Sequence, residues 1–142
     1  MTRFETTVEI ARPREEVFAY VADPARLADW NSAVERVTPL AGSARGGRHL
    51  MERRLPSGPA VNELLLEPRP PGELVMRTLS GPTPFVYRYT FTSVGTATRI
   101  TLHADVELTG VAALAGPLAA QAVKRGVDAN FRTLRGLLEH RA

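Results

Sequence analysis

Alternation of apolar and polar side chains over residues 85–108 is the feature that most constrains the fold of this chain. In PFVYRYTFTS every second residue is aromatic, and in TRITLHADVEL every second residue is aliphatic. Because successive side chains of a strand point to opposite faces of a sheet, both segments predict strands with one apolar and one wet face. The apolar set is Phe85, Tyr87, Tyr89, Phe91, Ile100, Leu102, Ala104, Val106 and Leu108.

Similar short segments follow one another from residue 33 to residue 108. They are separated by AGSARGG, LPSGP, PRPPG, SGPTP and SVGTA, which are rich in turn residues. No separator is long enough to hold a crossover helix, so neighbouring strands are expected to pair antiparallel. The pattern predicts about seven strands, near 3–10, 33–39, 47–55, 60–68, 73–80, 85–93 and 97–108.

Two short helices are predicted directly after the first strand. Pro13 is placed to be the first residue of one helix, and Asp23 is placed to cap a second helix that begins at Pro24. Both segments carry apolar residues at helical spacing. These residues are Val17, Phe18, Val21, Leu27 and Trp30.

From Pro117 onward the apolar period becomes 3.6, which predicts one long amphipathic helix. Its stripe consists of Val123, Val127, Phe131, Leu134 and Leu138. A sheet with a single apolar face and one amphipathic helix bury their apolar surfaces against each other. The sequence therefore predicts an α+β fold, with residues 1–142 forming a single domain.

Composition narrows the function classes. The chain has no cysteine, which excludes thiolate catalysis and iron–sulfur ligation, and it has no apolar run of membrane-spanning length. A net charge of +3 with dispersed basic residues argues against a nucleic-acid partner. We expect a cytoplasmic protein without integral membrane association, as a monomer or homodimer.

The order of these elements resembles the polyketide cyclase/dehydrase (SRPBCC) branch of the START-like, or Bet v 1-like, superfamily. The most specific segment is VEIARPREEVFAYVADPARLADWNSAVERV, residues 8–37, and GTATRITLHADVEL and VKRGVDANFRTLRGLLE support it. The resemblance implies a helix-grip fold, in which a curved sheet closes around the last helix and leaves an apolar cavity. It also implies a small hydrophobic ligand, polyketide-like or lipid-like, and no cofactor.

Small residues near the start of the last helix agree with a cavity, because larger side chains would fill the space. The same residues could instead simply favour helix. They are Ala112, Ala113, Ala115, Gly116, Ala119, Ala120 and Ala122.

Trp30 and Asn31 form the W–N pair that the resemblance places near the cavity mouth, where an indole covers a ligand and an amide bonds its oxygen. The alternative is that Trp30 plugs the core and Asn31 caps a turn. Tyr87 and Tyr89 are predicted to face inward, where a buried phenol needs a partner that a ligand carbonyl could supply. The alternative for them is an ordinary core.

Residues 47–66 do not reveal which way their side chains point, because both faces mix apolar and charged residues. A carboxylate held in an apolar cavity would have a raised pKa, which suits a general acid or base. A solvated rim position is the alternative. The sequence therefore leaves open whether the side chains of Glu52, Arg54, Asn62 and Glu63, and of Arg77 on the next strand, point inward or outward.

The predicted catalytic residues are Tyr87, Tyr89, Asn31 and Glu52. The predicted ligand-binding residues are Trp30, Asn62, Leu64, Met76, Phe85, Phe91, Leu102, Ala104, Leu118 and Ala122. No metal site is predicted, since His49, His103 and His140 lie on different elements. The leading hypothesis is ligand binding in the cavity, with cyclisation or dehydration of the ligand if the protein is an enzyme. The alternatives are a non-catalytic carrier or sensor and a protein-interaction module.

Overall fold

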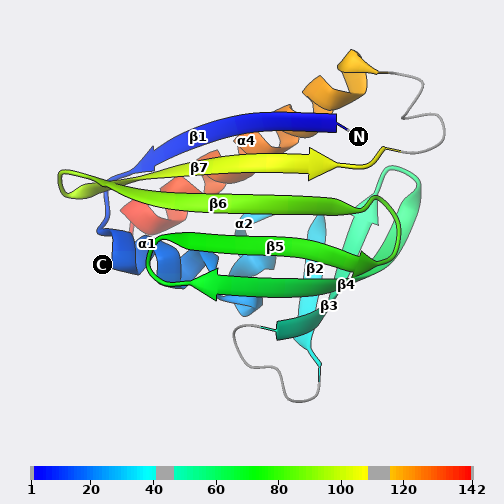
Figure 1. The fold of residues 1–142 in the computed structure, drawn as a ribbon, viewed down its shortest axis with the longest axis horizontal. Helices are drawn as coiled ribbons and strands as arrows, with labels where there is room; N and C mark the ends of the chain where they lie inside the picture. Colours follow the sequence, from blue (N-terminus) through cyan, green and yellow to red (C-terminus); the bar gives the residue numbers. More distant parts are fainter. Residues whose placement is uncertain (1, 41–46, 109–115, 142) are drawn as a thin grey trace.

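The computed structural model describes residues 2–40, 47–108 and 116–141 (Figure 1). Its strands are β1 (Thr2–Ile10), β2 (Val34–Pro39), β3 (Gly47–Leu55), β4 (Gly58–Arg69), β5 (Glu73–Ser80), β6 (Phe85–Val94) and β7 (Ala97–Val106). Its helical segments are α1 (Arg14–Val21), the 3-10 helix η1 (Pro24–Arg26), α2 (Leu27–Trp30) and α4 (Pro117–Glu139).

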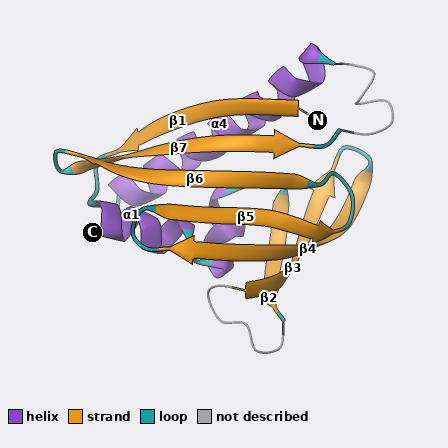
Figure 2. Ribbon diagram, in the orientation of Figure 1, coloured by secondary structure: helices purple, strands orange, loops and turns teal. Residues whose placement is uncertain are grey.

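The strands form one antiparallel sheet in the order β1-β7-β6-β5-β4-β3-β2. Each strand lies beside its neighbour in sequence, except that β1 pairs with β7, with Thr2 opposite Val106 and Ile10 opposite Thr98. Figure 2 shows α4 behind the sheet, beside β1 and β7. The predicted fold class, a sheet of about seven strands with a long C-terminal helix, is confirmed.

The β6–β7 hairpin shows the predicted division into two faces. Tyr89 stands opposite Leu102 and both side chains are buried, whereas Arg88 stands opposite His103 and both are exposed. The buried face is the one that faces the helices. The apolar alternation of this hairpin therefore fixes which face of the sheet is turned toward the helices.

α1 begins one residue later than predicted. Pro13 keeps an extended backbone, with ψ at 149°, and is the N-cap, so Arg14 is the first helical residue. The predicted second helix is divided into η1 and α2. Asp23 caps it as expected, because its Oδ1 accepts a hydrogen bond from the N–H of Ala25 at 3.0 Å.

α4 turns its apolar stripe toward the sheet, and Phe131, Leu134 and Leu138 are buried. Leu118 and Ala122, which were predicted to bind a ligand, are exposed, and Leu118 has an exposed fraction of 73%. At about 100° per residue, Leu118 lies roughly half a turn from Val127 around the helix axis. Contact of these two residues with a ligand stays a prediction, although the periodicity that turns the partly buried Val127 toward the core turns both of them outward.

The end of β1 and the end of α4 are joined by polar contacts. The N–H of Ala11 donates to Glu139 Oε2 at 2.8 Å. Arg12 donates from Nε to the carbonyl oxygen of Leu138 at 2.9 Å and from Nη2 to that of Arg141 at 2.7 Å. These bonds satisfy carbonyl groups that a helix end leaves without intrahelical partners.

Candidate ligand-binding site

A row of aromatic side chains crosses the buried side of the sheet. Phe85, Tyr87 and Tyr89 alternate along β6, with ring centroids 4.4 Å and then 6.2 Å apart. Tyr89 lies 6.4 Å from Phe131 of α4, which stacks at 6.4 Å on Trp30 of α2. We call these five residues the aromatic row; it is a continuous apolar path from β6 to α2.

Three polar hydrogens lie within the aromatic row without acceptors. The indole Nε1 of Trp30 is buried and has no hydrogen-bond partner in the part of the chain that the structure describes. Within the described residues, no hydrogen bond is found for the hydroxyl groups of Tyr87 and Tyr89. Buried polar groups in folded proteins are nearly always bonded, so the Trp30 indole marks a place for an acceptor atom, and the two tyrosine hydroxyl groups, which are not fully buried, can donate in the same row.

Burial also changes the acidity of both phenols. It raises the pKa of Tyr87 to about 12, although the positive charge of Arg53 acts in the opposite direction. The pKa of Tyr89 is likewise raised, first by burial and then by the neighbouring Tyr87. Both hydroxyl groups therefore carry their protons at neutral pH and can donate hydrogen bonds.

Arg53 is a candidate site residue that the sequence analysis missed. It lies on β3 with its guanidinium 5.5 Å from the centre of the Phe85 ring. Burial lowers its pKa, and the nearby Tyr87 partly opposes that effect. The side chain therefore places a positive charge at one end of the aromatic row.

Asn62 holds Arg53 and the β5–β6 turn in place. Its Oδ1 accepts from Arg53 Nε at 2.9 Å, and its Nδ2 donates to the carbonyl oxygens of Ser80 at 3.0 Å and Pro82 at 2.9 Å. Asn62 is fully buried. We infer that it positions Arg53 rather than bonding a ligand, because its amide is already occupied.

The turn that Asn62 bonds is unusually tight. Gly81 has φ at +99°, and a Cβ there would lie 2.4 Å from the carbonyl oxygen of Val61 and 2.7 Å from Asn62 Nδ2. Thr83 has φ at +52°, which is rare for a β-branched residue. Arg53 Nη2 donates to the carbonyl oxygen of Thr83 at 3.3 Å. The strained turn is thus fastened to the polar end of the aromatic row.

Two predicted catalytic residues are occupied elsewhere. Asn31 Oδ1 accepts from the N–H of Ala33 at 3.1 Å, which is the turn-capping role considered as the alternative. Glu52 faces the outer side of the sheet and bonds Arg36 Nε at 2.6 Å. The hydrogen bond from Arg36 lowers the pKa of Glu52, the opposite of the raised value that acid–base catalysis would use. A catalytic role of Glu52 stays a prediction, and this pairing does not support it.

The structure shows which way the charged side chains on β3, β4 and β5 point. Arg54 bonds Glu35, Glu63 pairs with Arg48, and Arg77 pairs with Glu67. Arg53, Met51 and Asn62 take the inner face instead. The remaining predicted ligand-binding residues are buried on that inner face, and their contact with a ligand stays a prediction: Leu64, Met76, Phe85, Phe91, Leu102 and Ala104.

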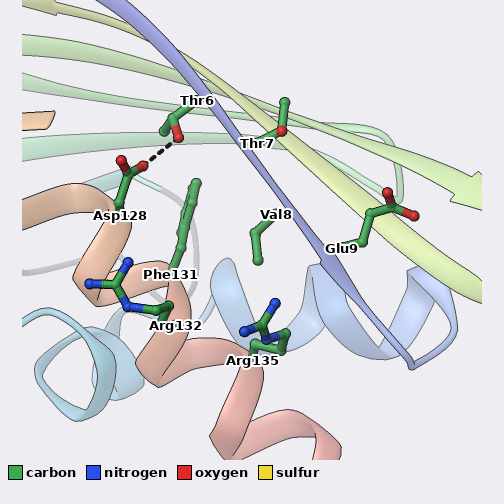
Figure 3. A pocket seen from close by; sticks show the side chains of 8 residues that line it. All are labelled: Thr6, Thr7, Val8, Glu9, Asp128, Phe131, Arg132 and Arg135. Carbon is green, nitrogen blue, oxygen red and sulfur yellow. Dashed lines mark hydrogen bonds between the residues drawn. The ribbon is translucent and has the colours of Figure 1, made fainter. Parts of the chain in front are cut away.

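Two hollows at the protein surface run along β1 rather than along the aromatic row. The first has a volume of about 490 Å³ and lies between β1 and α4 (Figure 3). The second lies over β1 and β7 and includes Ala104. The internal cavity stays a prediction, and Ala112, Ala113 and Ala115, which were expected to widen it, lie outside the described residues.

Comparison with known proteins decides the family. The family model for polyketide cyclase / dehydrase and lipid transport matches residues 1–139. The chain belongs to that family. No curated protein matches the chain significantly.

Solved structures share the fold of this polyketide cyclase/dehydrase family member. A START superfamily protein from Mycobacterium smegmatis is 16% identical with a TM-score of 0.79, covering 98% of each chain. A Thermus thermophilus protein is 17% identical with a TM-score of 0.82, covering 94% of each chain. The Zhui aromatase/cyclase from a Streptomyces species is 17% identical with a TM-score of 0.80, covering 98% of this chain and 94% of that one. These likenesses confirm the START-like fold.

Family membership agrees with an interior built for hydrophobic ligands, and within the described residues no helix is long and apolar enough to cross a bilayer.

The direction of Arg53 follows from the alternation of side chains along β3. This residue shares its strand face with Met51, and Met51 pairs with the buried Asn62 across β3 and β4. The equal mixture of charged and apolar residues on both faces hid that signal.

Proposed function

We propose that this protein binds a small hydrophobic molecule bearing carbonyl or similar oxygen atoms, of polyketide-like or lipid-like character, against the aromatic row. The observation that carries the proposal is the buried indole N–H of Trp30, which has no acceptor within the described residues, together with the unbonded hydroxyl groups of Tyr87 and Tyr89 in the same aromatic row. An unsatisfied buried donor costs about 1–3 kcal/mol. A ligand oxygen that accepts from one of them would recover that free energy.

The chemistry of these donors restricts the ligand. An indole N–H can only donate, and a phenol that keeps its proton donates readily. The surrounding rings offer flat apolar surfaces for an aromatic or extended ligand. The site therefore favours a flat or extended hydrocarbon skeleton with acceptor oxygens over a purely aliphatic molecule.

Binding can be tested by isothermal titration calorimetry with the hydroxyanthraquinone emodin, and with anthracene as a ligand that lacks oxygen. Loss of one hydroxyl hydrogen bond in Tyr87→Phe or Tyr89→Phe should weaken emodin binding about fivefold to tenfold. The matched control is Tyr20→Phe, because Tyr20 is also buried but lies between Arg26 and Arg141 rather than in the row. No binding of emodin, or equal effects of all three variants, would overturn the proposal.

A second candidate function is cyclisation or dehydration of a bound polyketide-like chain. It is favoured by Arg53, whose positive charge lies close enough to Tyr87 to influence its pKa. In an aldol cyclisation, an α-carbon proton of the ligand would pass to solvent water, and Arg53 would stabilise the enolate-like charge that develops. Tyr87 would donate its proton to the oxygen of the carbonyl that the enolate attacks, and would regain a proton from solvent. The aromatic row would hold the flexible chain in a folded geometry. No cofactor takes part in this scheme.

Turnover separates the two candidates. With a linear poly-β-keto thioester as substrate, product formation can be followed by mass spectrometry in the parent protein and in Tyr87→Phe. A cyclase should lose turnover in the variant while retaining binding, whereas a carrier or sensor should show no product and lose affinity alone. Unchanged product formation in the variant would exclude Tyr87 as the proton donor.

A further inference from the structure

The groove between β1 and α4 is polar, and of the aromatic row only Phe131 lines it. It is lined by Thr6, Thr7, Val8, Glu9, Asp128, Phe131, Arg132 and Arg135, and we call it the edge groove. Figure 3 shows β1 on one side of it and the side chains of Arg132 and Arg135 on the other. Phe131 is buried and forms its floor toward the protein interior.

β1 presents free backbone donors to the edge groove, because it is an edge strand that pairs with β7 alone. The N–H of Ala11 points away from β7 and donates to Glu139 Oε2. Successive N–H groups of a strand alternate in direction, so those of Thr7 and Glu9 point the same way as that of Ala11. No bond from these two groups to other elements is found in the described part of the chain.

The hairpin register supports the same parity. A two-residue turn separates Val94 from Ala97 and closes on that pair. Ala97 therefore directs its N–H and C=O groups to β6, and the next residue, Thr98, directs its own groups to the other neighbour, β1. Thr98 and its partner Ile10 are thus among the pairs that exchange hydrogen bonds across β1 and β7. The odd-numbered residues of β1 then direct their N–H and C=O groups to the free edge.

The edge groove holds two arginines and two carboxylates, and the carboxylates are paired mainly with other groups. Asp128 is bonded by Thr6 and by Lys124; burial alone would raise its pKa, but these hydrogen bonds, with the charges of Lys124 and Arg132, lower it. Glu9 pairs with Arg99, at 3.5 Å. Within residues 2–40, 47–108 and 116–141, no ion pair is found for Arg132 or Arg135.

The protein itself supplies an example of the ligand that this edge accepts. The carboxylate of Glu139 occupies the N–H of Ala11, the next outward-pointing donor after Glu9. The slot is limited at that end by Glu139 and at the other by the bond from Thr6 to Asp128. A short anion therefore fits the space better than a long strand.

We propose that the edge groove binds a small carboxylate, held by the guanidinium groups of Arg132 and Arg135 and by the N–H groups of Thr7 and Glu9. Arginine suits this role because its planar donors match the two oxygens of a carboxylate. This proposal does not depend on the proposed ligand binding at the aromatic row, although Phe131 borders both places.

The test is a titration of the ¹⁵N-labelled protein with glutarate, followed by NMR, with the uncharged diamide glutaramide as the control ligand. The amide signals of Thr7 and Glu9 should shift and saturate with glutarate and remain still with glutaramide. Added salt should weaken the binding, because the contacts are between charges near solvent. Shifts that fail to saturate, or that appear equally with glutaramide, would overturn the proposal.

Variants on α4 provide the second arm. Arg132→Gln and Arg135→Gln should each weaken glutarate binding by about tenfold, as expected for loss of one charge-assisted hydrogen bond. Arg125→Gln is the matched control, since Arg125 is exposed on the same helix and does not line the groove. An equal loss in the control would show a general charge effect and refute the site. Tighter binding of inorganic phosphate than of glutarate would refute the carboxylate assignment.

Discussion

Replacing Asn62 with alanine should destabilise this protein much more than a typical polar substitution. The change removes three hydrogen bonds from a fully buried amide, one of them from the charged Arg53. A neutral bond contributes about 1 kcal/mol and a bond to a charged group about 2 kcal/mol. The free energy of unfolding should therefore fall by about 4 kcal/mol, and Tm by about 13 °C.

Urea denaturation followed by circular dichroism measures this loss, and Asn31→Ala provides the matched control. Asn31 makes one side-chain bond, to the N–H of Ala33, at a partly buried position. Its loss should cost about 1 kcal/mol. Equal destabilisation by the two substitutions would refute the assignment of Asn62 as the residue that fastens Arg53 and the β5–β6 turn. It would restore the sequence-based prediction that Asn62 contacts a ligand.

Three further predictions concern stability. Gly81→Ala should cost at least about 2 kcal/mol in urea denaturation, because it combines a positive φ with a clash against the carbonyl of Val61. Because the pKa of Tyr87 is raised to about 12, its contribution to stability is complete below about pH 10 and is lost as the pH rises toward 12; Tyr87→Phe should reduce that alkaline loss. Because the pKa of Asp128 is lowered, its contribution is present at neutral pH and is lost as the pH falls through the lowered value; Asp128→Asn should reduce the acid-induced loss.

Each of these has a direct check. Gly95→Ala is the control for Gly81, since Gly95 also has a positive φ but has open space around its Cβ position; equal losses would show that the clash contributes nothing. Tyrosine absorbance across the alkaline range tests Tyr87, and titration of all phenols near pH 10 would contradict its burial. Thermal melts from neutral to acid pH test Asp128, and parallel curves for parent and variant would contradict its role.

The fold could be predicted because its strongest signals are periodic. The alternation around Tyr89 and Leu102 required one face of the hairpin to be buried, and the 3.6-residue period ending at Leu138 required one helix to cover it. Local chemistry was equally informative at Asp23, whose carboxylate caps the next turn as expected. These features depend on residues close together in the sequence.

The site was harder to predict because it depends on strand register. β3 carries charged residues on both faces, so the choice between Arg53 and Arg54 is decided by pairing with β4. The direction of Glu52 was open for the same reason, since its partner Arg36 lies on β2. Leu118 is exposed for a different reason, because it lies about half a turn around α4 from the stripe that packs on the sheet.

The pairing of β1 with β7 imposes an order on folding. The first strand cannot complete its ladder until the segment around Thr98 to Val106 is available, and its contacts with α4 involve residues still further along. Loops of this length must close before these contacts form, which slows folding in a chain of modest size. During synthesis, β1 and the segments after it would remain without their final partner until most of the chain had left the ribosome.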